Sequence, residues 1–109
     1  MTKRLFLALP LALALALPAS AASPTKKVTV NDDYFGSTSL TVKKGTKVKW
    51  VWNGTEAPHD VTVQSGPESF RSKLQTSGKF SHVMKKTGTY KLLCTTHAPD
   101  MAMTLTVVK

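Results

Sequence analysis

The stretch Tyr90-Lys-Leu-Leu-Cys-Thr-Thr-His-Ala-Pro-Asp-Met-Ala-Met103 contains the features that decide how this chain folds. Tyr90, Leu92 and Cys94 alternate with other side chains, which is the pattern of the inward face of a β-strand. The residues that follow include a proline and are typical of a tight loop. A second alternating run then occupies residues 101–107. The stretch predicts two neighbouring strands joined by a loop that carries cysteine, histidine and methionine side chains.

Short alternating runs of this kind recur along the rest of the chain, and turn residues such as Gly, Asn, Asp and Pro separate them. One segment, Ser65 to Ser77, lacks a clear period and could hold a short helix or an edge strand. Because the strands are short and closely spaced, the sequence predicts an all-β fold, a Greek-key β-sandwich of about seven or eight strands. The expected strands cover residues 26–30, 39–42, 46–52, 59–64, 79–84, 89–94 and 101–107.

The N-terminus has the organisation of a signal peptide. Lys3 and Arg4 precede a Leu- and Ala-rich run from Leu5 to Leu17, and Ala19-Ser-Ala21 supplies the small residues of a cleavage site. The apolar run is short for a membrane span, although a retained anchor is an alternative. We therefore expect residues 1–21 to be removed, with cleavage after Ala22 as a second possibility, and the mature protein to be periplasmic.

The remaining residues, 22–109, have the length of one compact domain. Loss of the two N-terminal cations lowers the Lys and Arg count from 15 to 13, against 6 Asp and Glu, so the formal charge is +7. An excess of lysine favours an acidic partner protein, or at most a peripheral contact with an anionic membrane. Nucleic acid is a poor fit, because the sequence has no basic stripe with stacking aromatics. The expected state is a monomer.

The loop after Cys94 combines a thiol, the His97 imidazole and the Met101 thioether within eight residues. These donors suit copper, and a second imidazole would complete the His-His-Cys plane with a weak axial Met that electron-transfer copper sites use. His59, which follows a loop in the middle of the chain, is the natural candidate. Met103 is a second possible axial donor, but Met101 is nearer the loop end, and we expect Met103 to pack in the core.

Each donor also has an ordinary structural explanation. A single free cysteine is commonly a small buried apolar residue, and a lone loop histidine commonly has no ligand. The third histidine, His82, lies between Phe80 and Met84 on an alternating run and is expected to be packed or exposed rather than ligating. It is the combination of Cys-x2-His-x3-Met with an upstream histidine that indicates a metal site.

These motifs resemble those of the cupredoxins, in particular the plastocyanin, pseudoazurin and amicyanin group. The segment Gly88-Thr-Tyr-Lys-Leu-Leu-Cys-Thr-Thr-His97 is similar to the Gly-x-Tyr-x-x-x-Cys-x-x-His signature of that family. Gly45-Thr-Lys-Val-Lys-Trp50 and Pro58-His-Asp-Val61 also match its pattern. The spacing between His97 and the first methionine lies between the shorter and the longer loops common in the group. The resemblance extends over most of residues 22–109 and is weakest in the aperiodic segment.

The resemblance implies one type 1 copper ion bound by His59, Cys94, His97 and Met101. It also places Asp60 where a side chain ties the two ligand loops together by hydrogen bonds. The implied function is transfer of single electrons between redox partner proteins, without enzymatic activity. A periplasmic copper-binding or delivery protein is the main alternative, and a structural β-domain with a buried thiol is another. Zinc is less favoured, because a thioether is a poor zinc ligand.

Overall fold

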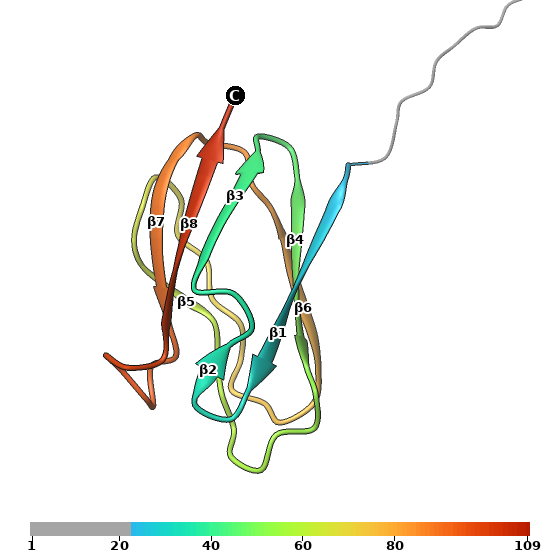
Figure 1. Cartoon of the computed structure of the whole chain (residues 1–109), viewed down its shortest axis with the longest axis vertical. Coiled ribbons are helices and arrows are strands. Elements are labelled where there is room, and N and C mark those ends of the chain that lie inside the picture. The colour runs from blue at the N-terminus through green and yellow to red at the C-terminus, as the bar shows by residue number, and fades with distance from the viewer. Residues whose placement is uncertain (1–22) are drawn as a thin grey trace, which may run out of the picture.

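The computed structural model describes residues 23–109, and these residues form a sandwich of two β-sheets (Figure 1). The expected signal peptide, residues 1–21, lies outside the described residues. The strands are β1 (Thr25–Asn31), β2 (Tyr34–Phe35), β3 (Ser39–Lys43), β4 (Lys47–Trp52), β5 (Thr62–Ser65), β6 (Gly78–Val83), β7 (Gly88–Leu93) and β8 (Ala102–Val108).

Each sheet has four strands, in the orders β2-β1-β4-β6 and β3-β8-β7-β5. The pairs β1–β4 and β3–β8 are parallel, and the other pairs are antiparallel. Of the connections between consecutive strands, only the β1–β2 turn and the β7–β8 loop stay within one sheet. The remaining connections cross between the sheets. The predicted all-β Greek-key sandwich is therefore confirmed.

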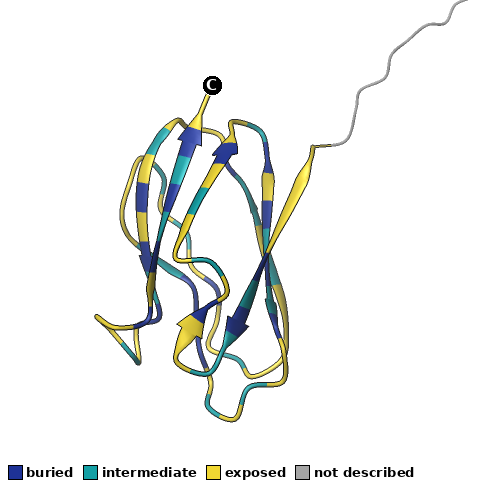
Figure 2. Ribbon diagram, viewed as in Figure 1, coloured by how far each residue is buried: buried dark blue, intermediate teal, exposed yellow. Residues whose placement is uncertain are grey.

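Alternation along the strands builds the core between the two sheets (Figure 2). In β4, Val48, Trp50 and Trp52 point inward, and Leu92 and Leu105 face them from the other sheet. Their exposed fractions are all 4% or less. Burying a large apolar side chain of this kind contributes about 1.5–3 kcal/mol, so this layer is the main source of stability.

The segment between β5 and β6 contains no helix. It pairs with residues around the start of β5 through two isolated bridges, His59 with Gln75 and Thr62 with Arg71. The expected strand over residues 59–64 is correct only from Thr62 onward. His59 forms an isolated bridge with Gln75 instead of belonging to this strand. Residues 34 and 35, which lie between two of the expected strands, form the short strand β2.

A tyrosine anchors this irregular segment to the β6–β7 turn. The Tyr90 hydroxyl lies 2.7 Å from the carbonyl oxygen of Lys86 and 2.9 Å from a carboxylate oxygen of Glu68. Gly66 passes so close to Tyr90 that an added Cβ would lie 2.7 Å from the ring. A side chain at that position would displace the ring, so the close approach requires glycine.

The strand directions assign the loops to two ends of the sandwich. The β1–β2 turn, the loop after β4 and the β7–β8 loop lie at one end, which we call the ligand end (Figure 1). The β3–β4 and β6–β7 turns lie at the opposite end, with the C-terminus. Within residues 23–109, no helix is long and apolar enough to span a bilayer.

Candidate metal centre

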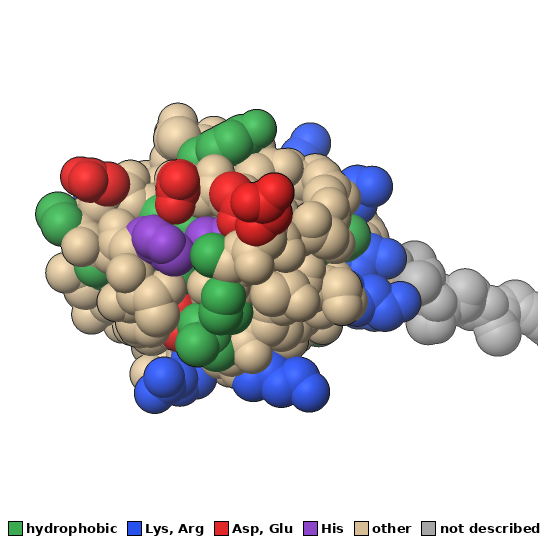
Figure 3. Space-filling model, turned by 90° about the horizontal axis from the view of Figure 1, so that it is seen from below, with side chains coloured by type: hydrophobic (Ala, Val, Ile, Leu, Met, Phe, Trp, Pro, Cys, Tyr) green, Lys and Arg blue, Asp and Glu red, His purple; other side chains and the backbone are tan. Residues whose placement is uncertain are grey.

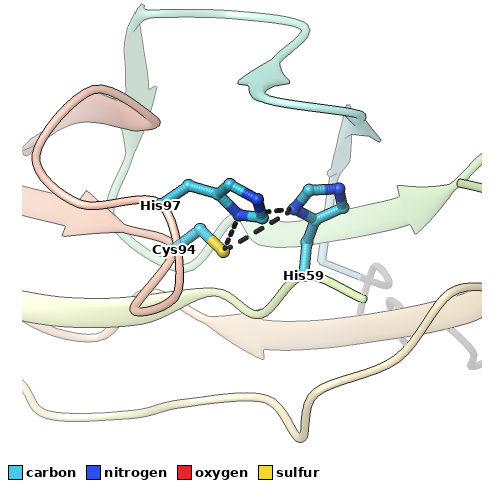
Figure 4. A group of neighbouring side chains, drawn as sticks. All are labelled: His59, Cys94 and His97. Atoms are coloured by element: carbon cyan, nitrogen blue, oxygen red, sulfur yellow. Dashed lines mark hydrogen bonds between the residues drawn. The ribbon is translucent and has the colours of Figure 1, made fainter. Parts of the chain in front are cut away.

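Three of the predicted ligands converge at the ligand end (Figure 4). The Nδ1 atoms of His59 and His97 are 3.2 Å apart, and they lie 3.7 and 3.5 Å from Sγ of Cys94. One donor atom from each residue falls within 4.8 Å of the others. His59 and Cys94 are fully buried, whereas the His97 side chain is 31% exposed. The three donors thus surround one point with a single imidazole edge accessible to solvent.

The backbone of the β7–β8 loop fixes Cys94 and His97. The amide of His97 donates to the carbonyl of Cys94 at 3.2 Å, and the amide of Met101 donates to the carbonyl of His97 at 3.2 Å. The amide of Cys94 in turn donates to the carbonyl of Met101 at 3.0 Å. Because these bonds close the loop on itself, the thiol and imidazole are held in place by the fold.

His59 is held from a different part of the chain. Its amide and carbonyl exchange hydrogen bonds with Gln75 at 3.0 and 3.1 Å. Its carbonyl also accepts a bond from the indole Nε1 of Trp52, at 3.0 Å. This anchoring fixes the imidazole on the far side of the cluster from the β7–β8 loop.

Two carboxylates from the β1–β2 turn face the outer nitrogens of the histidines. Nε2 of His59 lies 2.9 Å from Oδ1 of Asp32, and Nε2 of His97 lies 3.5 Å from Oδ1 of Asp33. A carboxylate accepts hydrogen bonds, so it favours the proton on Nε2 and leaves the Nδ1 lone pairs directed at the cluster. Neither residue was predicted from the sequence to belong to the site. Both positions lie outside the motifs that carried the prediction.

Asp32 also accepts bonds from the loop that precedes His59. The amides of Glu56 and Ala57 donate to its carboxylate at 2.9 and 3.1 Å. These backbone bonds, with the bond from His59, lower the pKa of Asp32 to about 2. The carboxylate therefore stays ionised well below neutral pH, and its oxygen can accept a hydrogen bond from Nε2 of His59.

Asp60 links the two ligand segments, as the resemblance implied. One carboxylate oxygen accepts the backbone amide of Thr95 at 2.7 Å, and the other accepts the Thr95 hydroxyl at 2.7 Å. Asp60 is only 2% exposed, whereas Thr95 is exposed, so the two bonds are partly buried. The residues that follow His59 and Cys94 are thus tied to each other.

The two methionines occupy different positions relative to this cluster. Met101 is 1% exposed, precedes β8 and is bonded through its backbone to Cys94 and His97. Met103 lies within β8, opposite Leu92, and is one strand position further from the loop. Of the two, Met101 is the one next to the cluster. His82 is remote from it, stacked on Phe70 at 4.0 Å, as the sequence predicted.

The chemistry of this donor set fits copper. A cysteine sulfur and two imidazole nitrogens are soft to intermediate donors. Met101, whose backbone bonds to Cys94 and His97, carries a thioether, which copper accepts and zinc does not favour. The donors are also preorganised by backbone hydrogen bonds and by carboxylates behind the imidazoles. The residues therefore match the trigonal His-His-Cys arrangement of a small copper protein.

This class is confirmed by comparison with known families. The model of the cupredoxin-like domain matches residues 4–107, and the chain belongs to this family. The match begins within the segment expected to be a signal peptide. Together, the family and the cluster of His59, Cys94 and His97 indicate one type 1 copper site in each chain.

Solved structures share the fold. A purple cupredoxin from Nitrosopumilus maritimus is 24% identical, with a TM-score of 0.64 over 74% of this chain and 97% of that chain. A Cu(I) form of an amicyanin variant is 25% identical, with a TM-score of 0.64 over 82% of this chain and 85% of that chain.

A larger protein is also similar in fold. The copper-containing nitrite reductase of Thermus scotoductus is 23% identical, with a TM-score of 0.68 over 89% of this chain. The matched region is 25% of the reductase chain, so the likeness concerns one part of a longer protein. No curated protein sequence matches the chain.

Proposed function

We propose that this protein carries single electrons between redox partner proteins, with copper held by His59, Cys94 and His97 and more weakly by Met101. The observation that carries the proposal is the convergence of two imidazole nitrogens and one thiol on one point. Bound copper would supply a Cu(II)/Cu(I) couple. We propose no enzymatic activity, because four protein ligands would leave bound copper no open coordination position for a substrate.

The protein residues contribute a fixed cage and an exit for the electron. Cys94 supplies a thiolate and His59 a buried imidazole, and both are held by backbone hydrogen bonds. A cage that is already formed needs little rearrangement when the charge of its occupant changes. His97 presents a partly exposed ring edge beside Ala98 and Pro99, which makes it the natural contact for a partner.

The compartment and the partner remain part of the proposal. The N-terminal pattern supports export to the periplasm, where a metal bond would also protect a single cysteine from oxidation. The lysine excess predicted a partner with an acidic docking face. That expectation rests on the total charge of the chain, and not on where the charges lie relative to His97. We further propose that the protein acts as a monomer, without a nucleic-acid partner and with at most peripheral membrane contact.

Titration of the protein with Cu(II), followed by visible absorption, tests this function. We expect an intense thiolate-to-copper charge-transfer band that saturates at one copper per chain. Cys94→Ser should abolish the band, whereas His82→Gln removes a histidine outside the cluster and should leave it unchanged. A folded protein that stays colourless throughout the titration would refute the carrier function.

A second measurement separates carrying electrons from delivering copper. Cyclic voltammetry of the loaded protein should give a reversible one-electron wave, and the copper should stay bound in both oxidation states. A delivery protein would instead pass its copper readily to a metal-free acceptor. Ready transfer, with loss of the absorption band, would favour the alternative function.

A further inference from the structure

The acidic residues of this chain are concentrated at the ligand end. Asp32 and Asp33 are in the β1–β2 turn, Glu56 is in the loop before His59, and Asp100 is in the β7–β8 loop. Figure 3 shows this end of the molecule, where acidic side chains gather beside the histidines. With the buried Asp60, five of the six Asp and Glu residues in the chain lie here.

Several of the lysines lie at the opposite end. Lys43 ends β3 and Lys44 follows it, and the amide of Lys44 donates to the carbonyl of Val108 at 2.7 Å. Lys85 and Lys86 form the β6–β7 turn at the same end. In Figure 3, Lys and Arg side chains appear only at the margins of the ligand end. Acidic side chains are therefore concentrated at the ligand end, although the total charge of the chain is positive.

The surface around the exposed imidazole is hollowed and acidic. A depression of about 440 Å³ is lined by Asp33, His97, Ala98, Asp100 and Met101. The carboxylate of Asp33 is 77% exposed and lies 3.5 Å from Nε2 of His97. Among residues 23–109, no Lys or Arg lines this depression. A partner that reaches His97 must therefore enter a negative local field.

We propose that the redox partner docks over His97 through a cationic surface rich in Lys and Arg, while the lysine-bearing end faces away from it. This inference rests on the proposed function, in that His97 is taken as the contact for electron exchange. It replaces the acidic partner that the total charge predicted, because a docking rate depends on the field near the contact more than on net charge. Acids at His97 attract cations and repel anions.

The local field can be measured on the protein without copper. Two probes serve, hexaamminechromium(III) and hexacyanochromate(III), which are paramagnetic ions of charge +3 and −3 that exchange their ligands too slowly to enter the cluster. At pH 8 and low salt, each is added to 15N-labelled protein, and broadening of amide signals is recorded. The cation should broaden the signals of Asp33, Ala98 and Asp100 most. The anion should broaden those of the turns at 43–45 and 85–87.

Matched variants assign the effect to named residues. The double variant Asp33→Asn and Asp100→Asn should reduce the cation broadening near His97 by at least about twofold. Asn also tolerates the positive φ of 72° at position 33. The double variant Lys43→Gln and Lys44→Gln changes the charge by the same amount at the other end, and should leave that broadening unchanged. Cation broadening spread evenly over the surface, or anion broadening around His97, would overturn the inference.

The same polarity should govern electron exchange. With copper loaded and reduced, oxidation by tris(phenanthroline)cobalt(III), a trication, should slow as salt is added, and oxidation by ferricyanide should accelerate. The opposite pair of salt dependences would contradict a negative docking field. Absence of any copper band, with the cation broadening intact, would refute the proposed function and leave the surface assignment standing.

Discussion

Oδ1 of Asp32 lies 2.9 Å from Nε2 of His59, and the same carboxylate accepts the amides of Glu56 and Ala57. One turn between two strands therefore positions both a buried imidazole and the loop that leads to it. In metal sites, such a carboxylate behind an imidazole makes the ring a stronger donor and fixes its orientation. The bond lies at the outer side of the cluster, where it would act on the metal only through His59.

Asp32→Asn should weaken Cu(II) binding by about 10- to 100-fold and raise the reduction potential. The carboxylate charge stabilises the more positive Cu(II) state, so its loss favours Cu(I). Copper competition titrations and spectroelectrochemistry measure the two effects. Glu56→Gln is the matched control, because it removes a nearby charge that does not bond to an imidazole. Equal shifts in the two variants would show that Asp32 acts only through its charge.

Asp60→Ala should lower both copper affinity and stability. It removes the acceptor for two partly buried bonds from Thr95, and a hydrogen bond of this kind contributes about 0.5–1.5 kcal/mol. Asp60→Asn should be much milder, because its carbonyl oxygen still accepts the Thr95 amide. Urea unfolding of the metal-free protein measures the stability term by itself. If the two variants unfold at the same urea concentration, the tie contributes little.

Met101→Leu and Met103→Leu should have different consequences. Both keep the side-chain volume nearly constant, so each should cost less than about 1.5 kcal/mol of stability. Only Met101 is bonded through its backbone to Cys94 and His97. Its replacement should therefore alter the charge-transfer spectrum and raise the potential, whereas the Met103 variant should retain both. A spectrum changed by Met103→Leu alone would reverse the assignment of the axial donor.

Local patterns in the sequence were sufficient to predict the sandwich and the ligands of the β7–β8 loop. Alternation identifies the inward face of each strand, and this placed Cys94 and Met103 in the core correctly. The His97 loop was predictable because its donors are close in sequence. His59 is 35 residues from Cys94, so it was a candidate only from its place after a loop, and its agreement with a family motif strengthened the prediction.

The role of the β1–β2 turn could not be predicted in this way. Asp32 and Asp33 reach the histidines because β1 pairs in parallel with β4, so that Val30 lies beside Trp52. That register brings the turn next to the loop that leads to His59, and no local pattern encodes it. The charge polarity was missed for the same reason, because composition counts charges without placing them at either end.

Glu68 illustrates a second arrangement that depends on distant contacts. It lies in the irregular segment, and its carboxylate accepts bonds from His82, from the amides of Lys85 and Lys86, and from Tyr90. Burial alone would raise the pKa of Glu68, but these hydrogen bonds outweigh it and lower the pKa from 4.5 to about 2. Burial and the Glu68 carboxylate also raise the pKa of Tyr90 to about 12.

Because the pKa of Glu68 is lower in the folded protein, its contribution is complete above about pH 4.5 and is lost as the pH falls toward 2. Glu68→Gln should reduce stability at neutral pH and flatten the acid loss in this range, as measured by urea unfolding of metal-free protein. Asp100→Asn, at an exposed site, is the control. An unchanged acid slope in Glu68→Gln would show that other carboxylates, including Asp32, cause the acid sensitivity.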